Sequence, residues 1–276
     1  MTIKKSTVVE NTKVVAEKKS VKTKKISTKK ESTVKPEKRV KSAVSGSSLE
    51  ALLESGAHFG HQVRRWNPKV KEFVYGEQDG VHIFDLVKTK ESLDKALEII
   101  NKTARENKTI LLVGTKKQIK DKVYEVAMET GISFVNERWL GGTLTNFNQI
   151  KKSLDKLAEL KENLKSGYYA KYTKKEKLLL EREAARLEKF FGGFATLKDK
   201  PDLLIVIDIR KEETVVREAK RVKVTTVGIV DTNADPNMVD YPIPMNDDAT
   251  KALTYVLDLI KQSILNGKEA VLSGKK

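Results

Sequence analysis

An alternation of short apolar runs with longer amphipathic stretches constrains the fold of this chain most strongly. Runs rich in Val, Ile and Leu recur from residue 81 onward, and stretches with helical periodicity separate them. Short apolar strands joined by helices are typical of a parallel sheet that helices cover on both faces. The sequence therefore predicts an α/β body with a doubly wound parallel sheet.

The bounds of the expected elements follow from where these runs begin and end. The expected strands are residues 81–86, 109–114, 132–136, 202–209, 224–231 and 241–245. The expected helices are residues 90–106, 116–130, 212–221 and 247–265. A short helix should precede them, because Ser48 can cap a leucine-rich stretch that Gly56 can end.

One stretch, residues 147–191, interrupts the alternation. Its apolar residues follow coiled-coil a and d spacing on both sides of the sequence SGYYAKY. Thr173 and Glu176 have the spacing of a capping box, which would begin the second of two helices. We therefore expect an inserted antiparallel helical hairpin. The predicted parts are an α/β domain formed by residues 46–146 and 192–267, the hairpin at 147–191 and a C-terminal tail at 268–276.

The N-terminal segment, residues 1–45, differs from the rest in charge and composition. It carries 14 Lys and Arg against 4 Glu, and the first aromatic residue of the chain is Phe59. Such a segment buries too little apolar surface to offset its ordering entropy, so we expect it to be disordered. It could be an electrostatic arm for RNA or a solubilising extension. The hairpin is also basic, whereas the charges of the α/β domain nearly balance.

Composition excludes several classes of protein. The chain has no cysteine, so it has no disulfide, thiolate metal site or cysteine nucleophile. It has no G-x-S-x-G elbow, no apolar run long enough to span a bilayer and no secretory signal, so we expect a cytoplasmic protein. A nucleotide site at residues 111–118 would lack the usual glycine patterns. Lys116 and Lys117 there could instead hold a phosphate of a nucleic acid.

The stretch GAHFGHQVRRWNPKV, residues 56–70, offers two kinds of site. His58 and His61 could bind a metal, but glycines bracket them in an expected loop and any zinc site would need a distant carboxylate. Arg64, Arg65 and Trp66 are residue types that contact nucleic acid. A grip on RNA, or a role in bracing the fold, is the better interpretation.

Carboxylates gather where the later strands end. Asp231 closes one expected strand, and Asp247 and Asp248 begin the last expected helix. Helix capping and turn formation explain such positions. Convergence of the three on a divalent ion is the alternative. In NERWLGGTLTNF, residues 136–147, Arg138 and Trp139 offer a guanidinium and an aromatic face to RNA, although Trp139 could simply cover the core.

Two segments, GAHFGHQVRRWNPKVKEFVYGEQDGVHIFDLVKT and NERWLGGTLTNF, resemble the bacterial ribosomal protein S-two (S2) family of the small subunit. The pieces DLLIVID, GIVDTNADP and YPIPMNDDA follow in order, so the resemblance runs from about Ser48 to about Gly267. It implies a flavodoxin-like α/β/α domain with an inserted helical hairpin. It also implies a structural, non-enzymatic protein that binds 16S ribosomal RNA and neighbouring ribosomal proteins, and that helps to recruit ribosomal protein S-one for translation.

Carried onto matching positions, the resemblance implies that both motif loops contact RNA or brace the fold. The residues concerned are His58, His61, Arg64, Arg65, Trp66, Asn67, Lys69, Arg138, Trp139 and Asn146. A bound metal is conceivable at the positions of Asp231, Asp247 and Asp248, and no other cofactor is expected. The chain departs from the family where Glu137 replaces a frequent histidine and where Arg210 and Lys211 replace a segment that often holds Asp and His.

The sequence thus predicts a structural ribosomal protein without catalytic activity. Two rivals remain open. A nucleotide-binding enzyme on the same sheet would bind a dinucleotide or a nucleoside triphosphate saturably. A general RNA-binding scaffold outside the ribosome would bind unrelated RNAs with similar affinity, mainly through the N-terminal segment.

Overall fold

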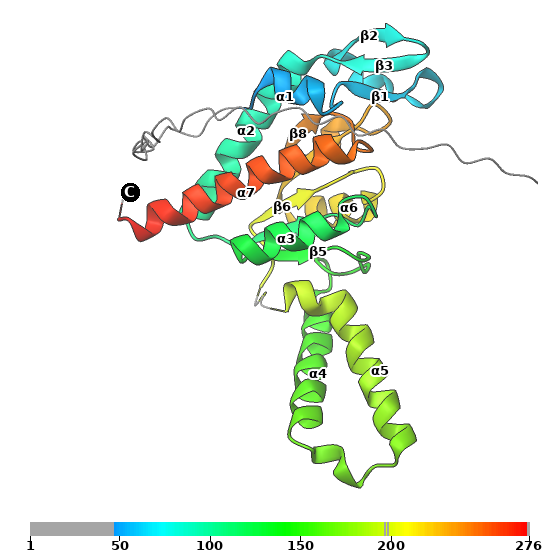
Figure 1. Cartoon of the computed structure of the whole chain (residues 1–276), viewed down its shortest axis with the longest axis vertical. Coiled ribbons are helices and arrows are strands. Elements are labelled where there is room, and N and C mark those ends of the chain that lie inside the picture. Colours follow the sequence, from blue (N-terminus) through cyan, green and yellow to red (C-terminus); the bar gives the residue numbers. More distant parts are fainter. Residues whose placement is uncertain (1–46, 196, 198, 275–276) are drawn as a thin grey trace, which may run out of the picture. The chain divides into compact units, whose positions relative to one another are not determined.

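A five-stranded parallel sheet forms the centre of the molecule in the computed structural model (Figure 1). Its strands are β4 (Ile110–Val113), β5 (Ser133–Val135), β6 (Leu203–Val206), β7 (Thr225–Val230) and β8 (Tyr241–Pro244). They lie in the order β5-β4-β6-β7-β8, and every neighbouring pair is parallel. Numbered along the chain this order is 2-1-3-4-5, the flavodoxin-like order. The predicted doubly wound α/β fold is therefore confirmed.

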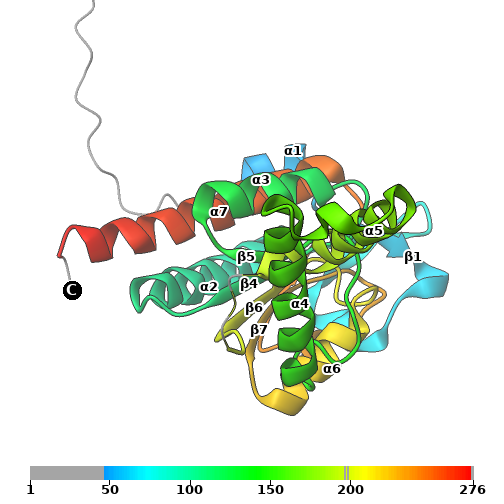
Figure 2. The ribbon, with the colours of Figure 1, turned by 90° about the horizontal axis from the view of Figure 1, so that it is seen from below.

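The centre of the sheet is buried on both faces because the strands β4 and β6 are apolar at every position. All residues of β4 and β6 are buried. Alternate side chains point to opposite faces, so Ile110 and Leu112 belong to one core and Leu111 and Val113 to the other. The first core is covered by α2 (Leu86–Arg105), α3 (Lys120–Thr130) and α7 (Thr250–Leu272), and the second by α6 (Glu213–Val222) and the base of the hairpin. Figure 2 shows these layers from below.

The inserted hairpin consists of α4 (Phe147–Lys165) and α5 (Lys174–Phe191), joined through the short helix η3 (Tyr168–Lys171). The hairpin extends away from the sheet, with η3 at its far end (Figure 1). The capping box of Thr173 and Glu176 begins α5, as predicted. Of the apolar residues at the expected spacing, Ile150, Leu154 and Leu157 are buried, whereas Leu164, Leu180 and Leu187 are half-buried. The ion pairs Lys156–Glu183 and Lys161–Glu188 join the two arms, each 2.5 Å long.

The prediction for residues 81–86 was wrong in one respect. They do contain a strand, β3 (Val81–Phe84), but it lies between β1 (Phe59–Gln62) and β2 (Val74–Gln78) in a separate antiparallel sheet. The reason is visible in the burial of β3, which alternates between buried and half-buried positions, as expected for a strand with one covered face. His61 therefore lies in a strand, although its segment was expected to be a loop.

Other boundaries differ by a few residues. The first helix, α1 (Leu49–Glu54), begins after Ser48 as predicted. By contrast, α3 begins at Lys120 and α7 at Thr250, so Lys116, Asp247 and Asp248 lie in the preceding turns and not in helices.

The structure describes residues 47–195, 197 and 199–274, all within one compact unit, Ser42–Lys276. The predicted disordered segment at residues 1–45 and the last two residues of the predicted C-terminal tail lie outside this part. None of the helices described there is long and apolar enough to cross a membrane.

Candidate functional site

The carboxyl ends of the parallel strands bring together charged residues that are far apart in the sequence. In a parallel sheet these ends share one edge, where doubly wound proteins usually bind ligands. Lys116 follows β4, Asp208 follows β6, Asp231 follows β7, and Asp247 follows β8. We call the group at this edge the charged cluster. Its members are His61, Lys116, Asp208, Asp231, Asp247 and Asp248.

Lys116 is the centre of the charged cluster. Its Nζ lies 3.0 Å from Asp208 Oδ2, 2.7 Å from Asp247 Oδ1 and 2.8 Å from Asp248 Oδ1. It also donates to the backbone carbonyl of Asp247, at 2.8 Å. Burial alone would lower the pKa of Lys116, but these hydrogen bonds and charges raise it above its ordinary value. The ammonium therefore stays charged and has no free donor to offer to an RNA phosphate.

His61 extends the charged cluster toward the first motif loop. Its Nδ1 lies 3.0 Å from Asp231 Oδ1, and its backbone N–H donates to Thr232 Oγ1 at 2.8 Å. The hydrogen bond to Asp231 raises the pKa of His61, although burial opposes the shift. The pKa of Asp247 is raised to about 7 by burial and by repulsion from Asp208 and Asp231, while Lys116 opposes that shift.

These two shifts predict how stability changes with pH. Both His61 and Asp247 hold a proton more tightly in the folded chain than in the unfolded one. The folded state therefore binds more protons near neutrality, so the free energy of unfolding should fall as the pH rises from about 6 to about 8. Urea denaturation across that range measures the slope.

His61→Gln and Asp247→Asn should each flatten this decline. His58, whose pKa burial lowers, contributes the opposite slope, so each variant is compared with the unchanged chain. A decline that is equally steep in both variants would exclude these groups as its source.

The first motif loop is held against the end of β7. The backbone N–H of Asn67 donates to the carbonyl of Thr232 at 2.7 Å, and Lys69 Nζ pairs with Asp235 at 2.6 Å. A Cβ at Gly60 would lie 2.5 Å from Thr232 Cγ2, so only glycine fits there. The ring centroids of Trp66 and His82 are 4.8 Å apart, and Trp66 is half-buried.

This packing leaves Arg64 and Arg65 exposed, in the short helix η1 (Val63–Arg65). Within the described part of the chain, neither guanidinium has a carboxylate partner. The shared metal site of His58 and His61, which the sequence left as the lesser alternative, is not among the converging ligand groups of the described residues. The ligand atoms that do converge, all within 4.8 Å of one another, belong to His61, Asp231 and Asp247. The His58 ring instead lies against that of Phe59, with centroids 4.0 Å apart and ring planes tilted by 40°.

The second motif loop is built around the carboxylate of Glu218, in α6. This buried carboxylate accepts hydrogen bonds from the backbone N–H groups of Gly142 (2.7 Å), Leu144 (2.9 Å) and Thr145 (3.2 Å), and from the indole N–H of Trp139 (3.2 Å). Burial favours its protonated form, but these bonds hold the pKa of Glu218 below its ordinary value. Trp139 is 7% exposed, so it is placed to brace this loop.

The same loop leaves two of the predicted RNA-binding residues exposed. Arg138 follows β5, and Asn146 caps the start of α4 without a side-chain hydrogen bond. Glu137, which replaces a histidine frequent in the family, pairs with Lys120. Its Oε2 atom also lies 3.7 Å from Nζ of Lys189, at the base of the hairpin. That carboxylate therefore joins the α/β domain to α5.

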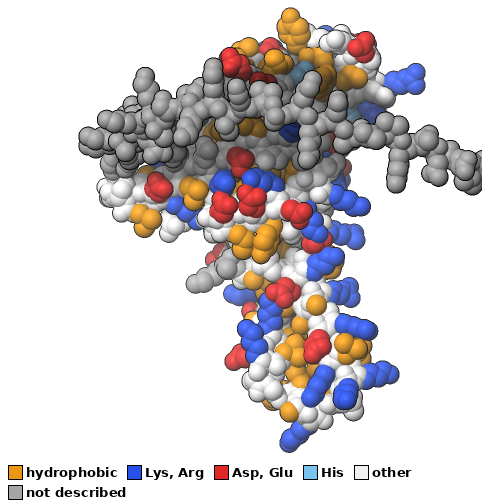
Figure 3. Space-filling model, viewed as in Figure 1, with side chains coloured by type: hydrophobic (Ala, Val, Ile, Leu, Met, Phe, Trp, Pro, Cys, Tyr) orange, Lys and Arg blue, Asp and Glu red, His pale blue; other side chains and the backbone are white. Residues whose placement is uncertain are grey.

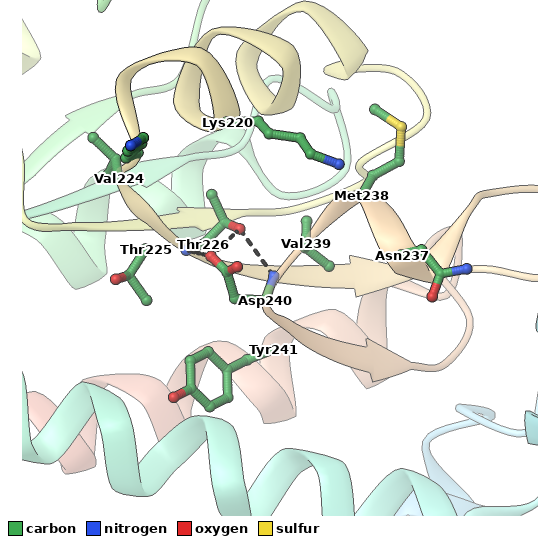
Figure 4. Close-up of a pocket in the computed structure, with 10 residues that line it drawn as sticks. Lys220, Val224, Thr225, Thr226, Asn237, Met238, Val239, Asp240 and Tyr241 are labelled. Carbon is green, nitrogen blue, oxygen red and sulfur yellow. Dashed lines mark hydrogen bonds between the residues drawn. The ribbon is translucent and has the colours of Figure 1, made fainter.

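A hollow at the opposite edge of the sheet, where β7 and β8 begin, is a weaker candidate site (Figure 4). Its volume is about 500 Å³, and Lys220, Lys223, Met238 and Tyr241 are among its lining residues. Its carboxylate, Asp240, already accepts hydrogen bonds from the backbone and the hydroxyl of Thr226. The carboxyl edge of the sheet therefore remains the better candidate.

Comparison with known proteins decides the family. The family model described as "Ribosomal protein S2" matches residues 52–267. The small ribosomal subunit protein uS2 of Coprothermobacter proteolyticus is 44% identical over 222 residues, which cover 80% of this chain and 83% of that protein. The protein of the same name from a Nitratiruptor species is 46% identical, with the same coverage. The chain belongs to the ribosomal protein S2 family.

In this member of the S2 family, four exposed cations lie at the carboxyl edge of the sheet. Lys117 follows β4, Arg138 follows β5, and the loop with Arg64 and Arg65 is fixed to the end of β7. All four side chains are exposed. We call these four residues the edge cations. Sequence reasoning did not single out Glu218 or Thr232, although these two residues set the shape of the loops that carry three of the edge cations.

Proposed function

We propose that this ribosomal protein is a structural, non-catalytic constituent of the small subunit that binds 16S ribosomal RNA through the edge cations. The observation that supports this most is that Arg64, Arg65, Lys117 and Arg138 are exposed at one edge, and that no carboxylate neutralises them within the described residues. Arginine and lysine supply most protein contacts to phosphate. Affinity should therefore fall steeply as the salt concentration rises.

The rigidity of the two loops supports the same proposal. Thr232 fixes the first loop and Glu218 the second, through hydrogen bonds to backbone groups. Side chains that leave a fixed backbone lose less entropy when they bind a partner than side chains on a mobile loop. The backbone that carries Arg64, Arg65 and Arg138 is thus held in one arrangement for binding RNA.

A nucleotide-binding enzyme is the less favoured alternative. Doubly wound sheets bind nucleotides at the switch point, here between β4 and β6. In this chain the ion pair between Lys116 and Asp208 occupies that point. A nucleotide phosphate would meet the carboxylates of Asp208 and Asp247 there, so we propose that the fold carries no catalytic site at this position.

We also consider a divalent cation as a ligand of the charged cluster. One histidine nitrogen and two carboxylate oxygens, from His61, Asp231 and Asp247, suit zinc, and Asp248 lies beside them. The ion would compete with the Lys116 ammonium for Asp247, and His61 would have to lose its proton. We therefore propose that the Lys116 ammonium, and not a metal ion, neutralises the carboxylates of this cluster, and that a metal binds it only weakly at neutral pH.

Recruitment of ribosomal protein S-one, which the family resemblance implies, also belongs to this proposal. A separate surface of the α/β domain suits a protein partner, because Leu53, Tyr75 and Val87 expose about half or more of their side chains around one apolar hollow. Neighbouring exposed apolar side chains often mark a protein interface.

Reversal of two edge cations tests the proposal. The double variant Arg64→Glu, Arg65→Glu should bind small subunits that lack this protein at least about tenfold more weakly than the unchanged chain. The slope of its log affinity against log salt concentration should decrease by the equivalent of about two phosphate contacts. Sedimentation of the labelled protein with such subunits, over a series of salt concentrations, measures both.

The matched control is Lys95→Glu, Lys102→Glu, which reverses two exposed cations on α2. It changes the net charge equally but leaves the carboxyl edge intact. Equal binding by both double variants would refute a specific role for the edge cations.

A further inference from the structure

The far end of the hairpin presents three neighbouring tyrosines. Tyr169 is half-buried at the centre, and its ring stands nearly perpendicular to those of Tyr168 (centroids 5.4 Å apart, 85°) and Tyr172 (5.1 Å, 88°). Asn163 donates to the Tyr169 hydroxyl at 3.4 Å. The central ring thus separates two outer rings that are 69% and 45% exposed. We call Tyr168, Tyr169 and Tyr172 the tyrosine tip.

The charges around the tyrosine tip are almost all positive. Residues 165–177 contain five lysines and a single acidic residue, Glu176. The Glu176 carboxylate is already bound to the backbone N–H and the hydroxyl of Thr173 in the capping box. Within the described residues none of the five lysines has a carboxylate partner, and Figure 3 shows Lys and Arg side chains over this end of the hairpin.

This arrangement costs stability in the isolated protein. Lys174 and Lys175 lie in the first turn of α5, where a positive charge opposes the helix dipole. The exposed faces of Tyr168 and Tyr172 gain little from burial. An anionic partner with flat apolar groups would offset both costs, because it would neutralise the lysines and cover the rings.

We propose that the tyrosine tip is a stacking site for unpaired RNA bases, with the surrounding lysines holding the adjoining phosphates. This inference rests on the proposed RNA-binding function and gives the hairpin a defined ligand. Aromatic rings bordered by cations are the usual means of binding single-stranded nucleic acid. Unpaired bases expose faces that can lie on a ring, whereas a duplex buries those faces between its own base pairs.

The position of the tip makes this a second contact, separate from the edge cations. The 19 residues of α4 extend over roughly 28 Å at the ordinary helical rise. The hairpin projects away from the sheet along this length (Figure 1). The tyrosine tip therefore reaches RNA that the carboxyl edge of the sheet does not.

The test uses the full chain and an RNA probe without structure of its own. Binding of a fluorescein-labelled oligouridylate of about 12 nucleotides is followed by anisotropy, beside an RNA duplex of equal length. The variant Tyr168→Ala, Tyr172→Ala should bind the single strand about tenfold or more weakly, because each ring stacks on a base. Its affinity for the duplex should be unchanged. Tyr168→Phe, Tyr172→Phe keeps the rings and should bind both probes as the unchanged protein does.

A matched control and a direct contact measurement accompany the titrations. Tyr124→Ala removes a tyrosine of comparable exposure, 51%, from α3, away from the tyrosine tip, and should change neither affinity. An oligouridylate that carries 4-thiouridine should crosslink at Tyr168 or Tyr172 on irradiation. Circular dichroism checks that the alanine variant retains its helices.

The inference is overturned if the alanine variant binds the single strand as the unchanged protein does and no crosslink forms at the tip. It is also overturned if the phenylalanine variant loses as much affinity as the alanine variant. The two proposals can fail separately. If Arg64→Glu, Arg65→Glu abolishes binding to subunits but the tyrosine tip binds no RNA, the proposed function stands and this inference alone is refuted.

Discussion

Replacement of Glu218 by glutamine should lower the free energy of unfolding by about 3 kcal/mol. Four N–H groups donate to the charged carboxylate. Hydrogen bonds to charged groups are worth about 1.5–3 kcal/mol each, but their contributions are not fully additive. Glutamine keeps the size of the side chain but replaces one acceptor oxygen with an NH₂ group. That group would face the backbone N–H groups of Leu144 and Thr145 or of Gly142. The second motif loop would then lose the centre that fixes it.

The measurement is urea denaturation at neutral pH. Glu213→Gln is the matched control, because Glu213 lies on the same helix but is exposed and pairs with Arg217 on the surface. Its loss should be below about 0.5 kcal/mol. The pKa of Glu218 is lowered in the fold, so its contribution is present at neutral pH and is lost as the pH falls through that lowered pKa. Equal stability of the two variants would show that the loop does not depend on Glu218.

Replacement of Lys116 by methionine should have an effect of similar size, about 3–5 kcal/mol, because removal of one partner leaves buried charges without compensation. Asp208, Asp231 and Asp247 would then lie at one edge with only His61 as a cation. The apolar stem of methionine fills most of the space of the lysine stem, so the loss is mainly electrostatic. Thermal and urea denaturation at neutral pH measure it.

Two further measurements separate charge from packing. Asp247→Asn combined with Lys116→Met should recover part of the lost stability, because it removes a carboxylate together with its cation. Zn²⁺ should raise the melting temperature of Lys116→Met more than that of the unchanged chain, since the ion then has no competing ammonium. If the double variant is as unstable as the sum of the single ones and Zn²⁺ has no effect, the ammonium is not the cation that holds this cluster together.

The sequence predicted the parallel sheet well because its central strands are apolar at every position and the others are mostly apolar. β4 and β6 are buried on both faces, and such runs stand out against amphipathic helices. β1 and β2 were not predicted, since they contain glycine, histidine and charged residues and are half-covered at most. Their pairing with β3 depends on where the chain places them, and this cannot be deduced from a short segment.

The site was predictable in its parts and not in its pairings. Strand ends gave Asp231 and Asp247, because parallel strands end at one edge. The partner of Asp247, Lys116, is 131 residues away, and the sequence suggested a phosphate for it. Glu218 looks like any other charged residue of an amphipathic helix, yet it fixes a loop 76 residues earlier in the chain. Only the packing of α6 on the sheet brings these residues together.

The two ends of the hairpin meet at its base, where Phe147, Phe191 and Phe194 pack in one core beneath the sheet. Among the described residues, the contacts between the hairpin and the α/β domain named above lie at the base of the two arms, and the far end projects away from the sheet (Figure 1). The outer part of the hairpin can therefore change length without disturbing that domain. Insertion or removal of seven residues in each arm would preserve the a and d pattern and move the far end by about 10 Å. The reach of this protein toward a distant partner can thus evolve in steps, independently of the domain that anchors it.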